Sequence, residues 1–193
     1  MGFKLSSDQM FSAPTAAKAL IQANNWRPYC LVHKNIKDEL VDINQENPNA
    51  VLIGDAEEGF CYQKLDYAFQ LCQSGAPLIG IGRNRYFKLD GKLHLDAGPF
   101  IHAIEYAASV KAINMGKPSI DFFRQVAAST RVKINESLMI GDDVFGDIDG
   151  AIKSGMQACL VKTGKYQMGD ENLISGKFAC VDSVVEAIEL ALS

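Results

Sequence analysis

The sequence predicts an α/β fold in which a parallel sheet is flanked by helices. Short apolar runs at residues 29–33, 50–54 and 78–82 are bounded by Pro, Asn or Gly, which is typical of buried strands. Between the second and third runs, residues 62–73 carry a helical apolar stripe that ends at a Ser-Gly pair. A strand–helix–strand order with connections of this length implies right-handed crossovers, so the sheet is at least partly parallel.

The elements around these strands follow from local signals. Ser12 is placed to cap a helix that should stop near Asn24. Residues 86–95 are typical of a hairpin with Asp90-Gly91 in its turn. A Gly-Pro pair then opens an apolar helix over about residues 99–110.

From residue 111 the alternation of strands and helices becomes tighter. A short strand at residues 112–115 is broken by Gly116-Lys117-Pro118, which starts a helix. The later elements are strands at residues 138–140, 158–161 and 178–181 and helices at residues 145–155 and 184–192. We therefore predict three segments: residues 1–27 before the first strand, an α/β unit at 28–110 and a second α/β unit at 111–193.

Composition excludes several classes of protein. The 193 residues are 48% hydrophobic and 22% charged, which is ordinary for a soluble globular chain. The net charge of -4 argues against a nucleic-acid partner, which normally requires a basic stripe. No apolar run approaches the roughly 20 residues that cross a bilayer, and no signal peptide is recognisable. Five scattered cysteines without C-x-x-C spacing are typical of reduced core residues, so we expect a cytoplasmic protein without a membrane partner.

An acidic loop follows the strand at residues 138–140. Asp142 and Asp143 come directly after this strand, and ligands of open α/β sheets bind beyond the carboxyl ends of the strands. Neighbouring carboxylates repel one another unless a cation offsets their charge, and oxygen ligands in a loop suit Mg²⁺. Asp143 has an alternative role as the N-cap of the next helix, and Asp149 as a solvated helix residue. For Asp142 and Asp147 we favour a functional role.

Basic residues mark two further positions. Lys117 is expected to open a helix, where its charge opposes the helix dipole, so its position favours a role towards a ligand. Arg83, Asn84 and Arg85 follow the strand at residues 78–82 and are candidates for substrate binding. The alternative is that these three side chains are solvated charges.

The combined motifs resemble one branch of the haloacid dehalogenase (HAD) superfamily. The motifs are Gly116-Lys117-Pro118, residues 139–143 with Asp147 and Gly150-Ala151, and residues 160–164. Their order and spacing, with an α/β insert before them, are similar to those of the 4-nitrophenyl, pyridoxal phosphate and phosphoglycolate phosphatases and the haloacid dehalogenase-like hydrolase domain-containing proteins. The resemblance covers nearly the whole chain and implies a partial HAD-like Rossmannoid core plus an inserted α/β cap domain at residues 28–110.

The resemblance also implies a chemistry. Members of this family carry out Mg²⁺-dependent phosphoryl transfer through an aspartyl-phosphate, here on a small phosphorylated metabolite. By resemblance Lys117 steadies the nucleophile and the phosphate charge, Asp142 ligates Mg²⁺, and Asp147 orients the metal's shell. Asp143 is a further candidate metal ligand because of its place directly after the strand. Cap residues, including the loop at residues 83–86, would select the leaving group.

One part of the family pattern is missing. The family's nucleophile lies in an Asp-x-Asp-Gly segment near the N-terminus, whereas the only acid before residue 38 is Asp8, which follows two serines rather than an apolar strand. The chain by itself is therefore expected to be inactive. Without the nucleophile strand, the strand at residues 138–140 would expose an edge, so the chain either misses residues of the functional protein or covers this edge by homo-oligomerisation, for example as a dimer.

Two other interpretations remain. The chain could be a non-catalytic descendant of the family that acts as a binding or dimerisation module. It could also be a flavodoxin-like or receiver-type domain, for which Asp55 is the only candidate phosphate acceptor.

Overall fold

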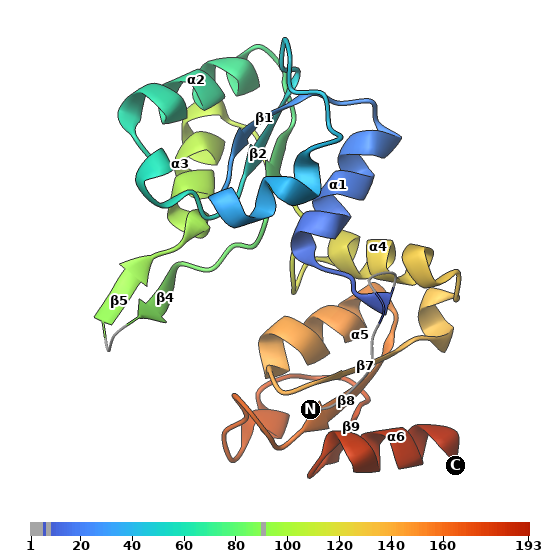
Figure 1. Cartoon of the computed structure of the whole chain (residues 1–193). Helices are drawn as coiled ribbons and strands as arrows, with labels where there is room; N and C mark the ends of the chain where they lie inside the picture. Colours follow the sequence, from blue (N-terminus) through green and yellow to red (C-terminus); the bar gives the residue numbers. More distant parts are fainter. Residues whose placement is uncertain (1–5, 7–8, 90–91) are drawn as a thin grey trace. The chain divides into compact units, whose positions relative to one another are not determined.

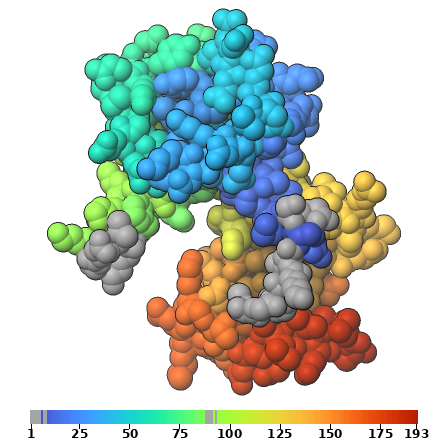
Figure 2. Space-filling model, in the orientation of Figure 1, coloured from blue at the N-terminus to red at the C-terminus, as the bar shows by residue number. Residues whose placement is uncertain are grey.

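The computed structural model describes residue 6 and residues 9–89 and 92–193. Asp8 and the predicted Asp90-Gly91 turn therefore lie outside the described residues. The chain forms two compact units, Met1–Gly116 and Lys117–Ser193. In Figures 1 and 2 the first unit is coloured from blue to yellow-green and the second from yellow to red.

The first unit is built on a parallel four-stranded sheet, which confirms the predicted α/β class. The sheet has the order β1 (Pro28–Leu31), β2 (Ala50–Ile53), β3 (Leu78–Gly80) and β6 (Ile113–Asn114). We predicted that β6 belongs to the segment that begins at residue 111, whereas the structure pairs β6 with β3 of the first unit. Two paired residues carry too little pattern to reveal their partner in the sequence.

Three helices and a hairpin complete this unit: α1 (Ala13–Ala23), α2 (Tyr62–Gln73), α3 (Ala97–Ala108) and the antiparallel pair β4 (Tyr86–Leu89) and β5 (Lys92–Leu95). Short 3₁₀ turns lie at η2 (Lys34–Ile36), η3 (Asp38–Leu40) and η4 (Glu57–Gly59). The predicted cap of the first helix is confirmed, because Ser12 Oγ accepts a hydrogen bond from the backbone N–H of Thr15 at 3.2 Å.

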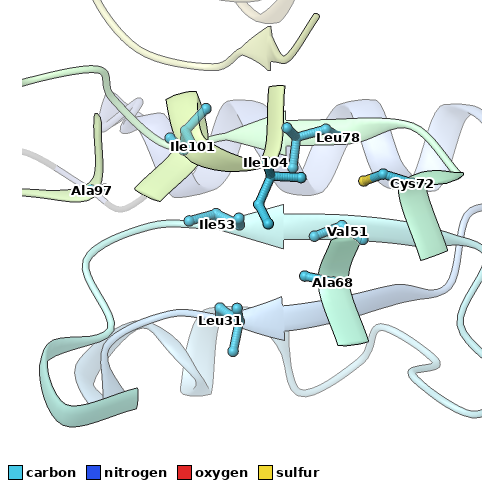
Figure 3. Packing of buried hydrophobic residues seen from close by; sticks show 9 residues of the cluster. All are labelled: Leu31, Val51, Ile53, Ala68, Cys72, Leu78, Ala97, Ile101 and Ile104. Carbon is cyan, nitrogen blue, oxygen red and sulfur yellow. The ribbon is translucent and has the colours of Figure 1, made fainter. Parts of the chain in front are cut away.

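The core of the first unit lies between the sheet and two helices. Figure 3 shows the apolar side chains of β1, β2 and β3 beside those of α2 and α3. The buried cluster comprises Leu31, Val51, Ile53, Ala68, Cys72, Leu78, Ala97, Ile101 and Ile104. Burying one large aliphatic side chain of this kind stabilises the fold by about 1.5–3 kcal/mol. The packing of this cluster therefore holds the three strands and the two helices in place.

The second unit contains a smaller parallel sheet in the order β7 (Leu138–Gly141), β8 (Gln157–Val161) and β9 (Ala179–Val181). Its helices are α4 (Ile120–Thr130), the π-helical turn η6 (Val144–Asp149), α5 (Gly150–Ser154) and α6 (Val184–Leu192), with 3₁₀ turns η5 (Ile134–Glu136) and η7 (Asp170–Asn172). Among the strands that the structure describes, β7 is an edge of this sheet, and Leu138 on it is 36% exposed.

One local expectation is wrong. Lys117 does not open a helix, because Ser119 is extended at φ -62° and ψ 132° and α4 begins only at Ile120. The argument from the helix dipole therefore does not apply to Lys117, and its role rests on its contacts.

Within the residues that the structure describes, no helix combines the length and the apolar character needed to cross a membrane. The five cysteines are free. Cys72 and Cys159 are buried, as predicted for core residues, whereas Cys30, Cys61 and Cys180 are only partly buried.

Candidate functional site

The acidic loop lies at the carboxyl end of β7. The strand ends at Gly141, and the chain passes through Asp142 and Asp143 into the π-helical turn. Asp143 Oδ1 accepts a hydrogen bond from the backbone N–H of Gly146 at 2.8 Å, so the predicted N-cap role of this side chain is confirmed. Its second oxygen, Oδ2, points to another group, the ammonium of Lys165, at 3.1 Å.

Asp147 is the buried centre of the site, with a relative exposure of 3%. Its Oδ1 lies 2.6 Å from Lys117 Nζ, and its Oδ2 accepts a hydrogen bond from the backbone N–H of Asp143 at 3.3 Å. A side chain at Gly141 would collide with the Asp147 carboxylate, so only glycine allows the acid to approach the end of the strand. The structure thus brings Lys117, Asp143 and Asp147 together.

Asp142 joins this group through the loop that follows β8. Its Oδ2 accepts a hydrogen bond from the backbone N–H of Lys165 at 2.6 Å. Gly164 has a left-handed φ of +54°, and a Cβ on it would strike Asp142, so a glycine is required on both counts. Because β7 and β8 are parallel neighbours, the loops after them meet at one end of the sheet.

Lys165 is the site residue that sequence reasoning missed. Its backbone binds Asp142 and its ammonium binds Asp143, although its side chain is 75% exposed. The Gly-Lys pair after a predicted strand was a usable signal. Assigning it would have required the knowledge that this strand pairs with the one before the acidic loop.

The contacts shift two pKa values in opposite directions. Burial alone would raise the pKa of Asp143, but the hydrogen bonds from Gly146 N–H and the Lys165 ammonium hold the pKa of this carboxyl below its usual value. The hydrogen bond to Asp143, with the nearby negative charges of Asp142 and Asp147, raises the pKa of Lys165. Both groups are therefore charged at neutral pH.

The donor set fits Mg²⁺. Asp147 Oδ1 is buried and in ion-pair contact with Lys117, yet among the described residues it accepts no hydrogen bond. Asp142 and Asp143 supply further carboxylates at the same end of β7. In the described part of the chain no three acidic, histidine or cysteine side chains form a metal cage. Mg²⁺ itself takes one or two protein carboxylates and completes its shell with water and phosphate.

Asp149 has a structural contact instead. Its Oδ2 pairs with Lys153 Nζ at 2.5 Å, one turn further along the helix. Residues 147–150 spell Asp-Ile-Asp-Gly, but they lie on helical turns, and the first of these acids is already paired with Lys117. They do not present a carboxylate at the end of a strand.

The predicted substrate-binding residues lie in the first unit. Arg83 forms a bidentate pair with Glu105, at 3.1 Å and 2.6 Å, and this carboxylate also accepts the Ala112 N–H at 2.8 Å. Burial alone would raise the pKa of Glu105, but these hydrogen bonds hold it below its usual value. Arg83 therefore links the loop after β3 to α3, and its guanidinium is less available to a ligand.

The two neighbouring residues are more available. Arg85 lies with its guanidinium 5.6 Å from the centre of the Tyr86 ring. Both arginines line an open pocket of about 560 Å³ together with Tyr86, Leu95, Gly98, Pro99 and His102. Asn84 is exposed, and its backbone carbonyl accepts the Gly98 N–H at 3.0 Å.

Comparison with known proteins identifies the family of the chain. Residues 114–187 match the HAD-hydrolase-like family model. The human phospholysine phosphohistidine inorganic pyrophosphate phosphatase is 40% identical over 195 residues, which cover 100% of this chain and 72% of the relative. The mouse haloacid dehalogenase-like hydrolase domain-containing protein 2 is 44% identical over 173 residues, which cover 90% of this chain and 67% of the relative.

A solved structure shows the same fold. The p-nitrophenyl phosphatase of Archaeoglobus fulgidus superposes with a TM-score of 0.84 at 17% identity, covering 98% of this chain and 77% of that protein. From the identity and coverage of its curated relatives, the chain belongs to the haloacid dehalogenase-like hydrolase family.

Proposed function

We propose that the second unit is the Mg²⁺- and phosphate-binding part of a phosphomonoester hydrolase. Asp142 and Asp143 would hold the metal, and Lys117 would neutralise negative charge on the phosphate. Asp147 would position Lys117 and orient the metal's shell. The observation that carries the proposal is the ion pair of Lys117 with the buried Asp147, at 2.6 Å, at the same strand end as the carboxylates of Asp142 and Asp143.

In this proposal Lys117 and the acidic residues of the site act electrostatically, by holding charged groups where the phosphate would bind. The Lys117 ammonium is held by a buried carboxylate, so it is oriented before the substrate arrives and little reorganisation is needed. When bound, Mg²⁺ would offset the charge that develops on the transferring phosphoryl group. The family's reaction proceeds through an aspartyl-phosphate, and none of the acids that the structure places at this site follows the pattern of that nucleophile. We therefore propose that the chain alone binds but does not turn over.

The substrate proposal rests on the relatives and on the first unit. The human relative is named for phospholysine, phosphohistidine and inorganic pyrophosphate, and the archaeal structure for p-nitrophenyl phosphate. For this chain we propose a small phosphorylated metabolite. Residues 28–110 would act as a cap, with Asn84 and Arg85 as its contacts to the leaving group and Arg83 as their support. The free cysteines favour a cytoplasmic location.

The second candidate, a non-catalytic binding or dimerisation module, is favoured by the edge position of β7 among the described strands. An unpaired strand edge tends to pair with another chain. We propose that a second copy covers it, so light scattering should show a dimer that Leu138→Lys converts to a monomer. A parent chain that is monomeric at high concentration would remove this candidate.

Phosphate binding and hydrolysis test the leading proposal. The chain should bind inorganic phosphate only with Mg²⁺, should lose this binding in Asp142→Asn, and should not hydrolyse 4-nitrophenyl phosphate or pyrophosphate. Asp121→Asn is the matched control, because Asp121 is an exposed acid of the same unit that pairs only loosely with Arg124, at 3.6 Å. Turnover that survives Asp142→Asn would show that the acidic loop is not the site.

A further inference from the structure

A second cavity lies within the first unit, at the carboxyl ends of β1 and β2. It has a volume of about 720 Å³ and lies between residues 30–37, residues 55–64 and the β4–β5 hairpin. Small molecules bind open α/β sheets beyond the carboxyl ends of the strands, typically in pockets of roughly 300–1,000 Å³. Position and size therefore qualify it as a ligand site.

One side of this cavity is aromatic. Phe60 and Phe100 stack with their ring centres 3.8 Å apart and their planes at 11°. Phe87 lies 5.6 Å from the His94 ring and is 37% exposed. Flat apolar surfaces that remain open to solvent beside a cavity are suited to receive another ring.

Several polar groups of the lining are already satisfied. His33 Nδ1 accepts the Asn35 N–H at 3.1 Å, and its Nε2 lies 3.3 Å from Glu57 Oε1. Asp55 Oδ1 accepts the backbone N–H of Glu57 at 3.2 Å. Burial raises the pKa of the Cys30 thiol to about 12, so this thiol is uncharged at neutral pH.

Most of the charged groups of the lining that lack a partner are cations. Within the described residues, the ammonium groups of Lys34, Lys37 and Lys64 have no ion-pair or hydrogen-bond partner, and Glu58 is the one lining carboxylate that also has none. The lining thus carries three ammonium groups and three carboxylates, but two of the carboxylates, Asp55 and Glu57, already accept contacts from within the lining. The unpaired ammonium groups can therefore bind an anionic head group beside the aromatic side chains.

We propose that this cavity binds a small aromatic anion, with the ring against Phe60 and Phe87 and the anionic head between the lysines. All of the lining belongs to the first unit, so this binding requires neither Mg²⁺ nor the acidic loop after β7. The proposal therefore stands or falls separately from the proposed function.

Phenylphosphonate is a suitable probe, because it carries a ring and an anionic head and is not a phosphate ester. The whole chain is titrated in EDTA and followed by ¹H–¹⁵N correlation spectra. We expect saturable shifts of the Lys34, Gly59 and Phe60 amides. Inorganic phosphate and benzyl alcohol, which each carry one half of the probe, should bind at least roughly ten-fold more weakly, because ring and charge contribute together.

Variants of the lysines test whether binding at this cavity differs from the weak binding of an anion to any exposed lysine. The Lys34→Gln/Lys37→Gln double variant should bind phenylphosphonate roughly three- to ten-fold more weakly, as expected for two partly exposed ion pairs. The control Lys111→Gln removes an exposed lysine of the same unit outside the cavity and should bind like the parent, as should Asp142→Asn. Absence of saturable shifts at the cavity, equal loss in the control, or equal binding of benzyl alcohol would overturn the proposal.

Discussion

Replacing Gly141 by alanine should displace Asp147 and destabilise the second unit. A Cβ at this position would lie 2.5 Å from Asp147 Cγ and 2.6 Å from its Cβ, whereas carbon atoms in contact need about 3.5 Å. The carboxylate must therefore retreat by roughly 1 Å, which disrupts its 2.6 Å contact with Lys117 and its 3.3 Å hydrogen bond. Overpacking of this kind costs about 1–3 kcal/mol, and a weakened buried ion pair adds to it.

Urea unfolding followed by circular dichroism measures the loss. Gly54→Ala is the matched control, because Gly54 also follows a parallel strand, and its added Cβ would find its nearest neighbours at 3.5 Å, an ordinary contact. We expect Gly141→Ala to lower the free energy of unfolding by about 2 kcal/mol and the control to change it by less than about 1 kcal/mol. Equal stability of Gly141→Ala and the parent would refute the tight approach of Asp147 to the strand end.

Three further predictions concern single contacts. Lys165→Met removes the ammonium that competes for Asp143 Oδ2, so Mg²⁺ affinity measured by calorimetry should rise by roughly two- to five-fold. The pKa of Glu105 is lowered in the folded state, so the ionised Glu105 stabilises the fold at any pH above its ordinary pKa of 4.5. This stabilisation is lost as the pH falls through the lowered pKa of the folded state. The urea midpoint of the parent should therefore decline below about pH 4.5, and it should decline less steeply in Glu105→Gln. Ser12→Ala removes the cap of α1 and should lower the free energy of unfolding by about 1 kcal/mol in urea.

The predictions for Lys165 and Ser12 each have a control variant. Lys162→Met removes a lysine that pairs with Asp182 at 3.0 Å, and it should leave Mg²⁺ affinity unchanged. Ser119→Ala alters a helix cap whose side chain makes no capping hydrogen bond, so it should cost almost nothing. If the urea midpoint of Glu105→Gln declined at low pH as steeply as that of the parent, the assigned contacts of Glu105 would be contradicted. If Ser12→Ala and Ser119→Ala lowered the free energy of unfolding equally, the assigned cap of α1 would be contradicted.

Local signals predicted most of the fold. The Ser12 cap, the bounds of α2 and α6 and the parallel pairing within the first sheet follow from periodicity and end signals in adjacent residues. The pairing of β6 with β3 and the π-helical start of η6 were not predicted. The pairing of β6 and the π-helical geometry of η6 both depend on tertiary contacts, which the two residues of β6 and the six residues of η6 do not reveal by themselves.

The candidate site was predicted in its acids and only partly in its cations. Asp142 and Asp143 could be recognised because they follow a strand directly, and Lys117 and Asp147 through the family motifs. Lys165 escaped because its contacts span more than twenty residues of sequence and depend on the pairing of β7 with β8. The Arg83 pair with Glu105 is likewise a long-range contact.

If the loop after β7 binds Mg²⁺, the backbone amide of Lys165 should report the bound ion. This N–H donates to Asp142 Oδ2 at 2.6 Å, so its ¹H–¹⁵N resonance senses any cation that this carboxylate holds. Titration of the whole chain with Mg²⁺ should shift this resonance saturably, and Asp142→Asn should abolish the shift while Asp121→Asn retains it. A Lys165 resonance that does not respond to Mg²⁺, or that responds equally in Asp142→Asn, would contradict the account.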